Sequence, residues 1–446
     1  MDMQRTPTSV RAELVEALSS CLSRNEEPFD RLRANGLKSI APEELTILRV
    51  LTLSTLFPDA SRPTFGGFVE RQTLGLAARE DVEVQVVAPM GLPPGPLKLI
   101  GHYRSRAALP SLEDWKGIKV HRPRFLHIPG PGIRITPSGM TRKLLPYLRQ
   151  LRRDFPFDII DAEYFWPDGV AAARIGQALN IPVSIKARGS DINAWGMRDF
   201  GRAHILEAGN SAQGMLAVSG ALRDDMVALG LPSDRIRVHY TGVDLDRFSI
   251  ADRDAAKTGL GITGPLLLCV GNLVPLKRQH LAIEALRHMP NASLLIVGDG
   301  PERGALEAQI AGSGFSGRAH LFGVRPHEAL PALFAAADVF VHPSSSEGLA
   351  NVWIESLACG TPVVVTNVGG AREVVDSPAA GQIVEPTPLA IAKAAGSLIA
   401  NPPDRSATRR SVERFTWAAN AEALHAHLSE LVERHQRRGD HTPLPA

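Results

Sequence analysis

Short apolar runs that alternate with longer amphipathic segments are the feature of this sequence that most restricts its fold. From Ile47 onward, runs rich in Val, Ile and Leu recur with helix-length stretches between them. Short, continuously apolar runs are typical of strands buried on both faces, and helical spacers supply the crossovers that parallel strands need. The pattern therefore predicts an α/β protein with doubly wound parallel sheets.

The predicted strands form two groups, separated by a polar stretch between Gly242 and Gly264 that carries no clear strand. In the first half we expect strands at Arg49–Thr55, Val82–Ala88, Lys119–Arg122, Ile159–Glu163, Val183–Ala187, Met215–Ser219 and Arg237–Tyr240. In the second half we expect them at Leu266–Val270, Ser293–Val297, His320–Phe322, Val339–His342, Val363–Thr366 and Gln382–Val384. Ligands of open parallel sheets bind at the carboxyl ends of the strands, so two such domains facing each other would enclose a cleft.

The grouping divides the chain into an extension, two Rossmann-like domains with a linker, and a helical tail. Residues 1–45 lack the strand rhythm, and we interpret them as an extension that is not integral to the fold, although Val10–Leu22 could form a cap helix. A polar, frayed end follows a helix predicted from Thr416 to Arg437. The predicted boundaries are 46–243 for the first domain, 244–263 for the linker, 264–415 for the second domain and 416–446 for the tail.

Charge and cysteine content exclude several classes of protein. Lys plus Arg number 49 and Asp plus Glu 47 among 446 residues, and this balance argues against a nucleic-acid-binding protein. The cysteines Cys21, Cys269 and Cys359 are far apart, as is usual in a reducing cytoplasm. The sequence shows neither a secretory signal nor a run of ~20 apolar residues. We therefore expect a soluble cytoplasmic protein that could still bind a membrane surface.

Two carboxylates near the end of the predicted strand Val339–His342 carry the strongest chemical signal. Glu347 falls in the loop after this strand, and Glu355 falls in the helix that follows. The backbone amides of Gly348, Leu349, Ala350 and Asn351 would then form a helix N-terminus, which favours anions. A nucleotide sugar combines phosphate with hydroxyl groups, and a carboxylate can stabilise its oxocarbenium-like transition state. The alternative is a pair of solvated acids at the start of a helix.

With seven residues between them, Glu347 and Glu355 match the E-x7-E motif of glycosyltransferase family 4, whose members are retaining enzymes with the GT-B fold. The flanking Pro343-Ser344, the segment 355–364 and Gly369-Gly370 match too, and the resemblance extends from Leu51 to the C-terminal helix. It implies a nucleotide diphosphate sugar as co-substrate and no metal or other cofactor. It also implies that Glu347 contacts the donor sugar and Glu355 the ribose hydroxyls.

The turn Gly271–Arg278 resembles the family segment that supplies an Arg and a Lys to the donor diphosphate. Lys277 matches the Lys, whereas Asn272 stands where the Arg is common, and Arg278 could compensate. Cationic donors stabilise the charge that develops on a diphosphate leaving group. Lys277 and Glu347 are thus the candidate catalytic residues, and a basic surface loop is the alternative interpretation of the turn.

Glycine pairs in two other loops are candidates for close approach to the donor. Gly66 and Gly67 precede a helix of the first domain, and paired glycines there allow close backbone approach to an anion. The family resemblance implies that their loop faces the donor phosphate or the acceptor across the cleft, whereas an isolated Gly-Gly pair is more often just a turn. Gly298 and Gly300 follow the strand Ser293–Val297 and would border the nucleotide. They also resemble a dinucleotide fingerprint, but they do not follow the first strand of their domain, so we reject a dehydrogenase.

Arg188 and Asp191 follow the strand Val183–Ala187, where many family members carry a His near the reacting sugar. We therefore assign no general base. Retaining transfer needs none, because the leaving phosphate can take the proton of the acceptor hydroxyl. We expect Arg188 or Asp191 to orient the acceptor or the phosphate, with a salt-bridged strand end as the structural alternative.

Two further patterns are weaker. Asp244-Leu245-Asp246 spells the D-x-D of an unrelated metal-dependent fold, but it lies in the interdomain segment, so we expect no metal there. The segment Thr141–Phe155 places leucines on one face and basic residues elsewhere. Such a helix can lie on an anionic membrane, or it can simply pack its leucines inward. The leucines are Leu144, Leu145, Leu148 and Leu151.

Together these features predict a retaining, metal-independent GT-B glycosyltransferase that acts on a glycan or lipid-linked acceptor in cell-surface polysaccharide synthesis. Its expected location is the cytoplasm or the inner face of the membrane. The alternatives on the same fold are a sugar-nucleotide epimerase and an inactive binding protein. The hypothesis of an inactive protein stays an alternative because of Asn272 and Arg188. An enzyme is favoured by Lys277, Glu347 and Glu355.

Overall fold

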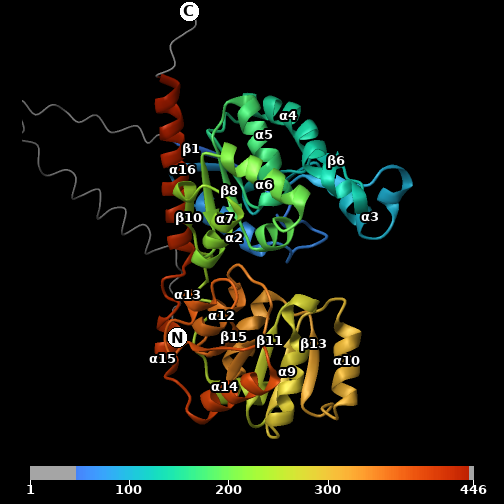
Figure 1. Cartoon of the computed structure of the whole chain (residues 1–446), viewed down its shortest axis with the longest axis vertical. Coiled ribbons are helices and arrows are strands. Elements are labelled where there is room, and N and C mark those ends of the chain that lie inside the picture. Colours follow the sequence, from blue (N-terminus) through green and yellow to red (C-terminus); the bar gives the residue numbers. More distant parts are fainter. Residues whose placement is uncertain (1–46, 441–446) are drawn as a thin grey trace, which may run out of the picture. The chain divides into compact units, whose positions relative to one another are not determined.

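The computed structural model describes residues 47–440, which belong to a unit that begins at Ile47 (Figure 1). Two sheets with helices on both faces make up this unit, as expected for a doubly wound α/β protein. The two sheets, parallel in all pairs but one, confirm the predicted fold class. The helix expected at Val10–Leu22 lies outside the described residues.

The first sheet has the strand order β10-β9-β8-β7-β1-β2-β5-β4 and is parallel except for the β4–β5 pair. Strand β1 pairs with β2 from Leu48 opposite Val82 to Leu53 opposite Val87. The strands are β1 (Leu48–Leu53), β2 (Val82–Val87), β4 (Leu112–Trp115), β5 (Ile118–His121), β7 (Ile159–Ala162), β8 (Val183–Ala187), β9 (Gly214–Ala217) and β10 (Ile236–Val238).

The second sheet has the order β13-β12-β11-β14-β15-β16 and is parallel throughout. Its central strands are wholly buried, which explains their continuous runs of Val, Leu and Ile. The strands are β11 (Leu266–Val270), β12 (Ser293–Val297), β13 (Ala319–Gly323), β14 (Val339–His342), β15 (Val363–Thr366) and β16 (Gly381–Val384).

Every predicted strand is present within one or two residues, but three further strands were missed. Strand β4 is an antiparallel strand with alternating exposed and half-buried residues, and its acidic residues hide it from a search for apolar runs. Strands β3 (Met90–Leu92) and β6 (Arg124–Leu126) have only three residues each and pair with each other in a separate small sheet. Runs so short carry too little periodicity to be recognised.

Helices connect the strands and cover the sheets (Figure 1). Around the first sheet they are α2 (Gly67–Ala77), α3 (His102–Ala107), α4 (Thr136–Asp154), α5 (Val170–Leu179), α6 (Asp199–Ser211) and α7 (Gly220–Leu229). Around the second sheet they are α8 (Arg253–Gly259), α9 (Gln279–Ala285), α10 (Arg303–Gly312), α11 (Leu330–Ala336), α12 (Asn351–Ala358), α13 (Ala371–Val374), α14 (Pro388–Ala400) and α15 (Arg405–Arg410).

The long last helix, α16 (Trp417–Asp440), returns to the first sheet, and Figure 1 shows it running along that part of the molecule. Its leucines Leu424, Leu428 and Leu431 are buried in one cluster with Leu48 and Ile159 of the first sheet. The chain therefore crosses twice between the two parts. The two crossing segments are joined where the Val243 amide donates to the Phe415 carbonyl at 2.8 Å.

Helix α4 packs its leucines inward. Leu144, Leu148 and Leu151 are buried in the main core, and Leu145 packs against it, while Arg142 and Lys143 are exposed. These leucines are thus not available to a membrane, which removes the basis for that interpretation of the helix. Within residues 47–440, no helix is both long enough and apolar enough to span a bilayer.

The strand orders identify where a ligand would bind. In the first sheet β1 lies between β7 and β2, and in the second sheet β11 lies between β14 and β12. The direction of winding reverses at these central strands, and ligands of open α/β sheets bind outside the carboxyl ends at such points. Thr55 follows β1, whereas Gly271 and Lys277 follow β11.

Candidate active site

Two loops at the carboxyl edge of the second sheet are tied together by one carbonyl group. The Leu276 carbonyl, in the 3₁₀ turn Pro275–Lys277, accepts from the Ser345 amide at 2.7 Å and from the Ser344 hydroxyl at 3.0 Å. The first loop follows β11 and the second follows β14, and these strands are neighbours. The tie therefore brings Lys277 and Glu347 to the same place.

Lys277 and Glu347 form an ion pair in which Nζ lies 2.5 Å from Oε1. Both side chains are largely buried, with 19% and 11% of their surfaces exposed. Gly271 borders the pair, and a side chain there would lie about 4 Å from both Lys277 Cε and His342 Nε2. A cation and a carboxylate thus meet at the switch point of the sheet.

His342, the last residue of β14, is a functional candidate that the sequence analysis missed. Its Nδ1 accepts from Trp353 Nε1 at 2.8 Å, and its Nε2 lies 3.7 Å from Glu347 Oε1. Burial lowers the pKa of His342 to about 4, so the ring is neutral at pH 7. With Nδ1 as the acceptor, the proton sits on Nε2 and faces Glu347. The available signal was a polar residue at the end of an otherwise apolar strand.

Glu355 lies in α12 with only 4% of its surface exposed. Its Oε1 lies 2.8 Å from His327 Nε2, in the short turn His327–Ala329, and 3.9 Å from a guanidinium nitrogen of Arg71. Arg71 also reaches His327 Nδ1 at 2.9 Å. Arg71 belongs to α2 of the first sheet's part of the chain, so no local pattern could have linked it to Glu355.

The other residues of the predicted donor turn do not join this ion pair. Asn272 is exposed, and its backbone carbonyl accepts from Gln279 Nε2 at 3.0 Å. Arg278 adopts a left-handed conformation with φ of 51° at the start of α9. Within residues 47–440, Lys277 is therefore the cation of this turn that contacts Glu347.

The glycines of the candidate loops have different roles from those expected. A Cβ at Gly298 would lie 2.0 Å from the Gly271 carbonyl oxygen, and one at Gly300 would lie 2.4 Å from that of Leu273. These two glycines let the neighbouring loops pack closely. Likewise a Cβ at Gly66 would lie 1.6 Å from the Leu56 carbonyl oxygen. Gly67 alone borders open space.

The loop that carries Glu347 also touches the first sheet's part of the chain. A Cβ at Gly189 would lie 2.9 Å from the Gly348 amide nitrogen, and one at Gly348 would lie 2.4 Å from the Arg188 carbonyl oxygen. The Gly348 carbonyl accepts from the Ser219 hydroxyl at 3.1 Å. Leu349 and Ala350 are buried between this contact and α12, which begins at Asn351.

Glu373 of α13 joins the two parts of the molecule a short distance away. Its carboxylate accepts from the amides of Gly220 at 2.9 Å and Ala221 at 3.2 Å, which begin α7, and from the Tyr240 hydroxyl at 2.8 Å. A carboxylate at a helix N-terminus is favourable because the free amides there are partly positive. This bridge helps to keep Gly348 packed against Gly189.

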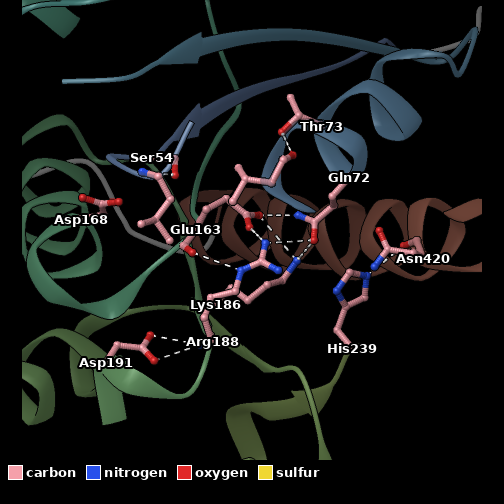
Figure 2. Close-up of polar contacts among 12 residues, drawn as sticks. Ser54, Gln72, Thr73, Glu163, Asp168, Lys186, Arg188, Asp191, His239 and Asn420 are labelled. Carbon is pink, nitrogen blue, oxygen red and sulfur yellow. Dashed lines mark hydrogen bonds and ion pairs between the residues drawn. The ribbon is translucent and has the colours of Figure 1, made fainter. Parts of the chain in front are cut away.

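The Arg188 side chain enters a buried charged cluster that includes Lys186 of β8 and Glu163, which follows β7. Figure 2 shows Arg188 and Lys186 converging on Glu163 and Gln72. The guanidinium pairs with the Glu163 carboxylate and also lies 4.8 Å over the Phe68 ring. The expectation that Arg188 orients the acceptor or phosphate directly gives way to the alternative, a salt-bridged strand end.

Asp191, like Arg188, holds the end of this strand in place. It is fully buried, and its carboxylate accepts from the amides of Phe165 at 3.0 Å, Arg188 at 3.0 Å and Gly189 at 2.8 Å. It therefore shapes the loop that touches Gly348 and has no free oxygen for a substrate. Figure 2 shows its carboxylate turned to the backbone of that loop.

The buried cluster has a defined charge pattern. Burial opposes ionisation of Glu163, but Arg188 and Lys186 hold its pKa at about 2. Burial and the Glu163 carboxylate raise the pKa of Asp161 well above its usual range. Burial lowers the pKa of Lys186 to about 8. The Glu163 carboxylate thus pairs with both cations, Lys186 and Arg188, of this cluster.

The D-x-D sequence forms a turn. The Asp244 carboxylate accepts from the amides of Asp246 at 3.2 Å and Arg247 at 3.0 Å. Local hydrogen bonds of this kind are common for Asp in turns and account for its presence.

Two family models match consecutive parts of the chain. The family model described as "Glycosyltransferase Family 4" matches residues 68–247, and the one described as "Glycosyl transferases group 1" matches residues 251–415. A putative teichuronic acid biosynthesis glycosyltransferase of Bacillus subtilis is 30% identical over 335 residues, covering 72% of this chain and 82% of that protein. A D-inositol 3-phosphate glycosyltransferase of Xylanimonas cellulosilytica is 28% identical over 361 residues, covering 72% and 84%.

Solved structures share the fold at lower identity. A sucrose-phosphate synthase of Thermosynechococcus elongatus matches with a TM-score of 0.72 and 20% identity, over 87% of this chain and 100% of that one. Anabaena HepE in complex with UDP matches with a TM-score of 0.66 and 20% identity, over 86% and 100%.

Proposed function

The chain belongs to the family 4, group 1 glycosyltransferases, which have the GT-B fold, and from this premise we propose that it transfers a sugar from a nucleotide diphosphate sugar with retention of anomeric configuration. The observation that carries the proposal is the Lys277–Glu347 ion pair at the switch point of the second sheet. Glu355, which has 4% of its surface exposed, adds a carboxylate for the ribose hydroxyls.

In the proposed reaction, the oxygen of an acceptor hydroxyl bonds to the anomeric carbon on the face that the diphosphate leaves. The bond between that carbon and the diphosphate oxygen breaks, and its electron pair leaves with the nucleoside diphosphate. The departing phosphate oxygen takes the hydroxyl proton, so no protein base is needed. The turn of Arg188 toward Glu163 supports a step without a base at that position.

Lys277 and the amides at the start of α12 would neutralise the leaving diphosphate, a role that does not require a metal ion. Glu347 would stabilise positive charge on the transferred sugar as the bond breaks. Neutral His342, with its Nε2 proton toward Glu347, would orient that carboxylate without cancelling its charge. Solved structures of similar fold hold UDP or UDP-glucose, which supports a nucleotide sugar donor.

We propose a glycan or lipid-linked acceptor and a role in cell-surface polysaccharide synthesis at the cytoplasmic face of the membrane. The names of two relatives support this. One is a teichuronic acid biosynthesis glycosyltransferase, and another, from Mycolicibacterium smegmatis, is a phosphatidylinositol monomannoside mannosyltransferase that is 35% identical over 241 residues.

A thermal-shift screen against UDP, GDP, ADP and their sugars tests the donor, because a ligand of the folded state raises the melting temperature. The nucleotide sugar that binds is then incubated with crude lipid and glycan acceptors, and the product's anomeric configuration is read by NMR. Transfer with retention is the expected result. Epimerisation without an acceptor, or binding without turnover of any donor, would contradict the proposal.

A further inference from the structure

The two carboxylate oxygens of Glu355 have different surroundings. Oε1 lies 2.8 Å from His327 Nε2 and 3.9 Å from a guanidinium nitrogen of Arg71. Oε2 accepts no hydrogen bond within residues 47–440 and is not sealed from solvent. Since only 6% of the side chain is exposed, the carboxylate has little room to rotate. The groups that engage Oε1 therefore determine where Oε2 points.

The position of the ring proton of His327 follows from its neighbours. Arg71 Nη2 lies 2.9 Å from His327 Nδ1, and Arg247 Nη1 lies 3.4 Å from the same atom. A guanidinium has N–H donors and no acceptor, so Nδ1 must offer a lone pair and the ring proton sits on Nε2. There it donates to Glu355. Arg71 thus selects the tautomer with which His327 holds the carboxylate.

The three residues come from elements that are far apart in the sequence. Arg71 lies one turn into α2, four residues after Gly67, whose side-chain position borders open space. Residues at this spacing share a helix face, so Arg71 lies on an open face of α2. His327 begins the turn between β13 and α11, and Glu355 lies in α12. The contact therefore joins the glycine loop of the first sheet's part of the chain to the carboxylate of the second.

Packing fixes the His327 ring as well. Its centroid lies 5.1 Å from that of the buried Phe248 ring, with 68° between the ring planes, which is a favourable edge-to-face arrangement. The neighbouring Arg247 also faces the Glu328 carboxylate at 3.7 Å, so its charge is shared. Arg71 is thus the guanidinium with the shorter contact to Nδ1.

We propose that His327 and Arg71 are positioning residues for the donor, which hold Glu355 so that Oε2 faces the ribose hydroxyls. The inference rests on the proposed function, in which Glu355 binds the ribose, and adds to it the residues that orient this carboxylate. Neither residue touches the donor in this scheme, and each acts through Glu355. Because Arg71 and Glu355 belong to different parts of the chain, the packing of the two parts and the affinity for the ribose are coupled.

Calorimetric titration of the full chain tests this with UDP, GDP and ADP, each beside its 2′,3′-dideoxy form. We expect wild type to bind the ribose form of at least one of them about 10-fold or more tightly than the dideoxy form. Arg71→Gln should lower that ratio about 3-fold or more and leave the affinity for the dideoxy form unchanged. Arg79, which follows the other end of α2 and pairs with Asp81 at 2.9 Å, supplies the control, and Arg79→Gln should keep the wild-type ratio.

Variants of His327 separate its hydrogen bond from its bulk. His327→Ala should lower the ratio as Arg71→Gln does, and His327→Gln, whose amide can still donate to Glu355, should restore part of it. His320→Gln, at an exposed position of β13, is the control and should change nothing. In a Glu355→Gln background, Arg71→Gln should have no further effect on the ratio, because residues that act as one unit are not additive. Melting temperatures of the ligand-free variants show whether the fold is intact.

The inference is overturned if Arg71→Gln and His327→Ala keep the wild-type ratio, weaken both nucleotide forms alike or bind the ribose form more tightly. Weakening of both forms alike is the result expected of a contact that only holds the two parts of the chain together. Equal affinity of wild type for the two forms would also overturn it, since no ribose contact would be left to orient. Failure of wild type to bind any of the three diphosphates would instead contradict the proposed function.

Discussion

Nζ of Lys277 lies 2.5 Å from Oε1 of Glu347, so the cation expected at the diphosphate and the carboxylate expected at the sugar neutralise each other in this structure. The two residues come from loops after β11 and β14, and the Leu276 carbonyl ties those loops together. A diphosphate that binds Lys277 would compete with Glu347 for the ammonium group. Binding of the donor would then release Glu347 toward the sugar.

Glu347→Gln should lower kcat by ~10- to 100-fold, because the carboxylate is proposed to contact the sugar most strongly as positive charge develops there. Affinity for the nucleoside diphosphate, which lacks the sugar, should change much less. Steady-state kinetics and calorimetry check the two effects, with Glu385→Gln on the surface as the control. Full turnover of Glu347→Gln at saturating donor would show that Glu347 does not stabilise the transition state.

Lys277→Ala should weaken binding of the nucleoside diphosphate and slow transfer, because the proposed diphosphate site loses its cation. The exposed Lys393 of α14 offers a matched control, and Lys393→Ala should change neither quantity. The loss should be about 10-fold or more in the dissociation constant. Unaltered affinity would reassign the phosphate contact, with Arg278 as the next residue to test.

Glu355→Gln should chiefly raise the KM for the donor, since the ribose environment barely changes during the reaction. A donor that lacks the ribose hydroxyls offers a sharper measurement. In wild type, its KM should be raised to a similar extent, and in Glu355→Gln the deoxy donor should bind no worse than the normal one. A further loss in the variant would show that Glu355 acts elsewhere, for example only by holding Arg71 and His327.

Asp168 should make the stability depend on pH. Burial raises its pKa to about 7, although the Thr55 amide and hydroxyl donate to it at 2.7 and 3.1 Å. Between about pH 4 and 7 the folded state keeps a proton that the unfolded state has lost, so this contribution to stability falls as the pH rises and levels off above 7.

Replacing Asp168 by Asn removes this titration. We expect the free energy of unfolding of Asp168→Asn, relative to that of wild type, to rise from pH 5 to pH 8 by an amount on the order of a few kcal/mol or less. The exposed Asp234 supplies the control, since Asp234→Asn should follow the wild-type profile. Parallel profiles for Asp168→Asn and wild type would show that the carboxyl is ionised throughout this range.

Much of the fold and the core of the candidate site could be predicted because both depend on local patterns. Each apolar run between helical spacers makes a buried strand, and the carboxyl ends of parallel strands meet at one edge. Glu347, Lys277 and Glu355 each follow such a run closely. Their positions after strands of one sheet, together with the family resemblance, predicted a shared site, and the structure pairs Lys277 with Glu347.

Only the tertiary structure decided which partners these residues meet. Arg71 reaches Glu355 from a helix of the other part of the chain, and Arg188 turns toward Glu163 rather than the cleft. The protonation of His342 follows from its burial against Phe340 and Trp353. Contacts and burial of this kind depend on how separate elements pack.

The packing of separate elements also explains the roles of the glycines and of α16. Gly298 and Gly300 resemble a phosphate-binding loop in sequence, but the neighbouring Gly271 and Leu273 carbonyls occupy the space that a side chain would need. A helix at the end of the chain was predictable from its leucines, whereas its return to the first sheet was not. A sequence specifies which face of an element is apolar, and the packed fold alone determines which surface covers it.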